Sequence, residues 1–164
     1  MPPVRLQVKG YGEIAEAVLV AFLFPALAFS LQGESTHILL VMLTLPLVLF
    51  YLGNGIVTGL RNYGQDESHE RRTLTTVLGW QRSVQMHNLF TLAAFFLIGI
   101  FLAIGLPWRL AWPMLLGMPV AAFQIYLVIL LAEGGKPRWQ LLQLSSTTLF
   151  LLETYLISLT LWIS

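Results

Sequence analysis

Carboxylate, imidazole and guanidinium side chains gather between residues 61 and 82 of a chain that is otherwise apolar. Asp66, Glu67, His69 and Glu70 offer oxygen and nitrogen ligands, and Asp66 and Glu70 are separated by about one helical turn. Carboxylates at this spacing could share Mg²⁺, which prefers oxygen ligands and usually also binds phosphate oxygens. The alternative is a solvated loop whose charges only set the topology of the chain.

Arginines in the same stretch could hold an anion beside such a cation. Arg61, Arg71 and Arg72 supply the guanidinium groups, which match phosphate oxygens in pairs. Lys136 and Arg138, in a predicted turn at residues 133–139, could reach the same anion or instead contact lipid phosphates. A mixed cluster of this kind suits a ligand with a diphosphate head and an apolar tail.

The apolar composition of the chain indicates which structural elements position these polar residues. The chain has 164 residues, of which 57% are hydrophobic and 10% charged, with a mean hydropathy of +0.76. A soluble domain of this size could not bury so much apolar surface, so we expect lipid to cover it. We predict an all-α integral membrane bundle of about five transmembrane helices, forming a single domain over residues 1–164. The predicted spans are residues 13–31, 37–60, 84–105, 109–132 and 140–163, with a polar loop at 61–83.

Basic residues set the predicted orientation. Eight of the nine Lys and Arg residues, including Arg5 and Lys9, fall on one side of the predicted spans, and only Arg109 falls on the other. The positive-inside rule then puts the N-terminus and the polar loop in the cytoplasm of a bacterial-type inner (plasma) membrane, and the C-terminus outside. The net charge of +1 gives no reason to expect nucleic acid as a partner, and the absence of cysteine excludes thiolate metal sites.

Two polar residues lie inside predicted spans. Asn54, among the small residues Gly53, Gly55 and Gly59, could bond to a facing helix or line a cavity. Glu153 lies deep in the last apolar run, where a carboxylate is either functional or hydrogen-bonded to a neighbouring helix or subunit. Pro113, Gly117 and Pro119 together predict a bend in the fourth span.

The segment from Thr58 to Leu74, followed by Val77-Leu78-Gly79, resembles the second aspartate-rich motif of the UbiA superfamily of membrane prenyltransferases. It is most similar to the menaquinone-type branch, which prenylates 1,4-dihydroxy-2-naphthoate and has the pattern Asn-Asn-x-Arg-Asp-x-x-x-Asp-x-x-x-Gly-Lys-Arg-Thr-Leu. The resemblance covers essentially all of this chain but only the C-terminal half of a family member.

The resemblance also implies a weakened site. The first aspartate of the family's motif falls on Asn62, the second on Asp66, and the glycine on Glu70. In the family, two such loops hold Mg²⁺ and a prenyl diphosphate, and this chain carries only one. The resemblance therefore implies Asp66 as a weak Mg²⁺ ligand with Asn62 and Glu70. Diphosphate would bind to Arg61, Arg71, Arg72, Lys136 and Arg138.

Three functions follow as hypotheses. The first is a non-catalytic, prenyltransferase-like subunit of a larger membrane complex, in contact with lipid, other integral subunits and a quinone or isoprenoid pigment. The second is half of a split Mg²⁺-dependent enzyme that moves a polyprenyl group from its diphosphate to an aromatic quinone precursor. The third is a small transport or anchor protein. The depleted acidic motif favours the first.

Overall fold

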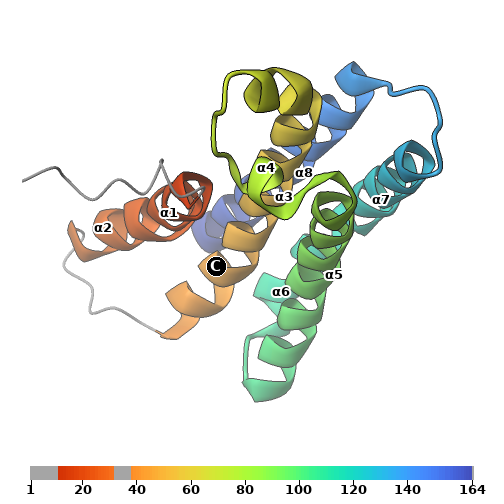
Figure 1. The fold of residues 1–164 in the computed structure, drawn as a ribbon. Helices are drawn as coiled ribbons and strands as arrows, with labels where there is room; N and C mark the ends of the chain where they lie inside the picture. Colours follow the sequence, from red (N-terminus) through yellow and green to blue (C-terminus); the bar gives the residue numbers. More distant parts are fainter. Residues whose placement is uncertain (1–10, 32–37, 164) are drawn as a thin grey trace, which may run out of the picture.

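The computed structural model describes residues 11–31 and 38–163, and all regular structure within those ranges is helical (Figure 1). Arg5 and Lys9, which contribute to the charge argument above, lie outside the described residues. In chain order the elements are α1 (Gly12–Val18), the π-helical turn η2 (Leu19–Leu23), α2 (Phe24–Leu31), α3 (Ile38–Ser68), α4 (Leu74–Leu78), α5 (Trp80–Ile104), α6 (Trp108–Met114), the 3₁₀ turn η3 (Leu115–Gly117), α7 (Met118–Ala132) and α8 (Trp139–Ile163).

The prediction of an all-helical fold is confirmed for the described residues. Within the described ranges, four helical runs are long and apolar enough to cross a membrane: α3, α5, the run from α6 through α7, and α8. Large apolar side chains such as Leu92, Phe96 and Leu144 are exposed on the outside of these helices. Water would disfavour such a surface, whereas lipid would not.

The first predicted span, residues 13–31, is helical without a gap, but its regular α-helix changes to a π-helical turn between α1 and α2. In this turn, η2, the N–H of Phe24 donates to the carbonyl of Leu19. Pro25 follows directly and has no N–H to donate to the carbonyl of Ala21, which accounts for an irregular turn at this point, and the helix continues through Pro25 as α2. This run is not among the four long apolar helices.

The predicted polar loop at 61–83 is wrong in extent. Helix α3 continues for two further turns beyond Leu60, to Ser68, and α5 begins at Trp80 rather than at residue 84. Residues 61–68 contain Arg, Gln and Glu, which are good helix formers, and no proline. The apolar run ends at Leu60, but the helix continues to Ser68. Polar residues can extend a helix into water, because its backbone hydrogen bonds do not require apolar side chains.

Helix α3 is the centre of the bundle. It packs against α5, α8, α4 and the N-terminal helical segments, and 61% of its most apolar window is buried, against 22–39% for the other three long runs. The bend predicted from Pro113, Gly117 and Pro119 falls where the 3₁₀ turn η3 interrupts the regular α-helix between α6 and α7. Because α3, α5, the α6–α7 run and α8 alternate in direction, the α3–α5 connection and the α7–α8 turn lie at the same end (Figure 1). We call this the polar end.

Candidate functional site

The predicted site lies where α3 ends. The N–H of Arg71 donates to the carbonyl of Asp66 at 2.8 Å, and the N–H of Glu70 donates to that of Glu67 at 3.2 Å. This pair of bonds is a Schellman turn, which ends a helix through one residue in the left-handed conformation. That residue is Glu70, with φ of +52°, and it is the only non-glycine residue with positive φ among those described.

Glu70 therefore occupies a backbone position that favours glycine. We expect Glu70→Gly to stabilise the chain by about 0.5–1 kcal/mol, because a side chain with a Cβ is strained in this conformation and glycine is not. Glu67→Gly removes the same charge from a right-handed helical position one turn earlier and should instead destabilise by a similar amount. Thermal unfolding of both variants in detergent micelles measures the contrast. Equal changes in the unfolding midpoint would contradict it.

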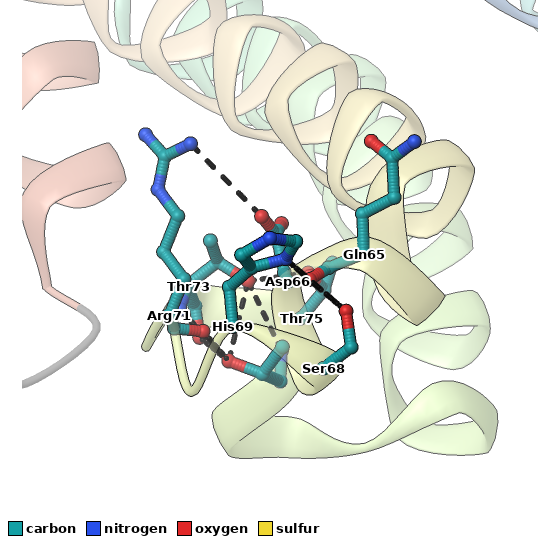
Figure 2. Close-up of polar contacts among 8 residues, drawn as sticks. Gln65, Asp66, Ser68, His69, Arg71, Thr73 and Thr75 are labelled. Atoms are coloured by element: carbon teal, nitrogen blue, oxygen red, sulfur yellow. Dashed lines mark hydrogen bonds and ion pairs between the residues drawn. The ribbon is translucent and has the colours of Figure 1, made fainter.

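Asp66 is the acidic side chain of this stretch that turns into the protein. Its side chain is 11% exposed and lies 4.0 Å from the Arg71 guanidinium, which is 77% exposed (Figure 2). At this length, and with the arginine largely in solvent, the ion pair contributes about 0–1 kcal/mol. Asn62 and Glu70, the other two predicted metal ligands, are exposed. Among the described residues, no three His, Asp or Glu side chains converge as a metal site would require.

Glu13 joins this region from the other end of the sequence. Its carboxylate accepts a hydrogen bond from the N–H of Leu74, at the start of α4, at 2.5 Å, and it is close enough to interact electrostatically with Asp66 and Arg71. Thr73 and Thr76 form a capping box at the same helix start. The sequence does not suggest this role, because the partners are 61 residues apart. Glu13 thus ties α1 to the polar end.

The predicted anion-binding residues all lie at the polar end, but their side chains do not converge on one position. Arg61 donates to the side-chain oxygen of Gln143 on α8 at 2.5 Å, and Arg71 faces Asp66. Arg72 is exposed, as are Lys136 and Arg138 in the turn between α7 and α8. The structure therefore groups these charges at one end of the bundle without gathering them around one ligand position.

The two predicted intramembrane polar residues have different surroundings. The side-chain oxygen of Asn54 accepts a hydrogen bond from the Thr147 hydroxyl of α8 at 3.2 Å, so Asn54 bonds to a facing helix, one of the two alternatives predicted for it. Glu153 is fully buried, and neither of its carboxylate oxygens has a hydrogen-bond partner among the described residues. It lies against Gly117, at the bend between α6 and α7.

A buried polar pair that the sequence does not reveal links α5 to α7. The ring Nε2 of His87 lies 2.7 Å from the side-chain nitrogen of Gln124, and both residues are buried. The other ring nitrogen lies 3.1 Å from the Asn88 side-chain oxygen, and the Thr91 hydroxyl donates to the His87 carbonyl at 3.0 Å. Each residue alone looks like an ordinary polar interruption of an apolar run. Only the packing of the helices brings them together.

Comparisons of the chain with protein-family models, curated proteins and solved structures found no match.

Proposed function

We propose that this chain is a non-catalytic subunit of a larger membrane complex, built on a half-bundle of the UbiA prenyltransferase type and in contact with quinone or isoprenoid lipid. The observation that supports the non-catalytic role is the set of groups that surround the Asp66 carboxylate. Asp66 forms an ion pair with the guanidinium of Arg71, and the two residues expected to share a cation with it, Asn62 and Glu70, are exposed. Holding a diphosphate through metal ions needs several converging oxygen ligands.

The conformation of Glu70 supports the UbiA resemblance. The family's motif has a glycine where this chain has Glu70, and Glu70 adopts a left-handed backbone conformation that favours glycine. A backbone of the family's shape, retained after the glycine was lost, accounts for this otherwise unfavourable residue. The same substitution places a carboxylate at a position that the motif keeps free of side chains.

We further propose five crossings, with the polar end in the cytoplasm of a bacterial-type inner membrane. Of the basic residues described, six lie at the polar end, and Arg109 lies at the other. The contact from Glu13 to Leu74 holds the start of α1 at the polar end, whereas α3 begins at the opposite end. Residues 12–31 would be about 30 Å long as a helix, which matches the hydrocarbon thickness. This arrangement supports a fifth crossing.

Asp66→Asn tests the non-catalytic role. We expect the variant to assemble normally and to leave the activity of its host complex nearly unchanged, because the substitution removes only a weak ion pair. The measurements are copurification of a tagged chain from native membranes and the activity of the recovered complex. Glu67→Gln, at an exposed position on the same helical turn, is the control.

The same purified complex also distinguishes the non-catalytic role from the split-enzyme hypothesis. A split prenyltransferase would consume a prenyl diphosphate in the presence of Mg²⁺, and Asp66→Asn would abolish that reaction while leaving assembly intact. Such a result would overturn the proposed function. Recovery of a large complex that contains the chain and has no such reaction would support it.

A further inference from the structure

The turn between α7 and α8 has a defined shape at the polar end. Helix α7 ends in a Schellman turn, in which the N–H of Gly135 donates to the carbonyl of Leu130 at 2.9 Å and that of Gly134 donates to Leu131 at 3.2 Å. Gly134 has φ of +85°, and a Cβ at Gly135 would lie 2.7 Å from the Leu130 carbonyl oxygen. The two glycines therefore fold the chain tightly back over α7 and present Lys136 and Arg138 beside its end.

These two basic residues line a shallow pocket. The other residues that line it are Leu127, Leu130 and Leu131 of α7, Pro137 of the turn, and Leu142 of α8, and among these leucines Leu130 is exposed. The space reaches about 230 Å³ only when the open mouth is counted, and the enclosed part is about 10 Å³, so the pocket is a surface groove and not a cavity. Apolar walls exclude a small hydrated anion from the interior of the pocket, whereas they suit an alkyl chain. The pocket thus joins a cationic rim to an apolar floor.

Aromatic residues of the types that are common at the depth of lipid headgroups lie next to these basic residues in the chain or contact their neighbours. Trp139, the first residue of α8, lies edge-on to Trp80 with ring centroids 6.2 Å apart, and Trp80 lies edge-on to Tyr63 at 5.8 Å. Trp and Tyr concentrate where hydrocarbon meets the headgroups. Neither Lys136 nor Arg138 forms an ion pair with a described residue, so both charges are free to bind an external anion.

We propose that this pocket binds an anionic phospholipid, with Lys136 and Arg138 on the phosphate group and an acyl chain on the leucine walls. Basic pockets between helices at the cytoplasmic face recognise such lipids through this combination of charge and apolar surface. The site differs from the Asp66 region and does not depend on the proposed subunit role. It would fix the ends of α7 and α8 to the membrane surface.

Native mass spectrometry of the full chain in detergent micelles, titrated with phosphatidylglycerol or phosphatidylcholine, tests this site. We expect one phosphatidylglycerol molecule to bind to each chain. Phosphatidylcholine should bind with an affinity lower by about tenfold or more. The double variant Lys136→Gln/Arg138→Gln should lose this preference. Arg109→Gln, at an exposed arginine on the other end of the bundle, should keep it. Equal binding of the two lipids, or a preference unchanged in the double variant, would overturn the proposal.

A second experiment, in which small phosphates compete with bound lipid, distinguishes a site for phospholipid from a site for free phosphate. Inorganic phosphate and glycerol 3-phosphate carry the anion but no acyl chain, so they should not displace bound phosphatidylglycerol at comparable concentration. Displacement by either would reduce the site to simple anion binding and contradict the role of the leucine walls. The thermal midpoint of the double variant in neutral detergent should equal that of the parent chain, because both basic side chains are exposed.

Discussion

Gly117→Ala should lower the free energy of unfolding of the bundle by about 2 kcal/mol or more, because the added methyl group has no room. A Cβ at Gly117 would overlap the carboxylate of Glu153 and lie 3.3 Å from a methyl group of Leu149. The carboxylate ends a flexible side chain, but Glu153 is fully buried, so it cannot turn aside into solvent. Either α8 or the bend between α6 and α7 must move.

A double variant identifies the cause of this loss. Glu153→Ala removes the overlapping atoms, so Gly117→Ala/Glu153→Ala should be more stable than the sum of the two single changes predicts. Glu153→Gln keeps the shape of the side chain and should be tolerated, since an uncharged group suits a buried position without a charged partner better than a carboxylate anion does. Thermal unfolding in detergent micelles measures the two single alanine variants, the double variant and Glu153→Gln.

Gly55→Ala provides the matched control. Gly55 lies in α3, which like the α6–α7 run is long and apolar enough to cross a membrane, but a Cβ at Gly55 would meet no atom within 4 Å. Alanine is a better helix former than glycine, so this change should be neutral or stabilise by about 0.5–1 kcal/mol. Similar responses at Gly55 and Gly117 would mean that Glu153 does not pack against the bend, and would remove the reason to regard that carboxylate as a fixed part of the core.

The sequence predicts the long helices well because their apolar runs exceed what any soluble element needs. The predicted spans at 84–105, 109–132 and 140–163 differ from the helices by a few residues at most. The end of α3 is different. Hydropathy marks where the apolar run ends, at Leu60, whereas the helix ends at the left-handed Glu70 turn, which no hydropathy pattern reveals.

The candidate site was predictable in its position but not in its internal contacts. Asp66 and the arginines do lie at one end of the bundle, as their clustering in the sequence suggests. Their partners come from distant segments: Glu13 reaches α4 across 61 residues and Gln143 meets Arg61 across 82. Local spacing cannot anticipate such pairs, because helix packing decides them. The buried pair of His87 and Gln124 escaped the sequence analysis for the same reason.

Gly59→Ala is expected to detach α4 from α3. A Cβ at Gly59 would lie 2.5 Å from the hydroxyl oxygen of Thr75, 2.7 Å from its methyl carbon and 3.1 Å from its Cβ. Thr75 is fully buried and β-branched, so its side chain has few alternative rotamers and α4 itself must shift. We expect a loss of about 1–3 kcal/mol, measured as a lower thermal midpoint in detergent micelles. Amide hydrogen exchange in residues 74–78 should also be faster than in the parent chain.

Gly53→Ala is the internal standard for this experiment. Gly53 lies on the same helix and is also buried, but a Cβ there would meet Thr91 and His87 at 3.7–4.0 Å, which is ordinary packing distance. Gly53→Ala should therefore be nearly neutral, and Thr75→Ala should restore part of the stability lost in Gly59→Ala. Equal losses at Gly53 and Gly59 would show that α3 needs small residues along its whole face. A loss confined to Gly59 would instead assign the close contact to α4, the helix whose first N–H is bound by Glu13.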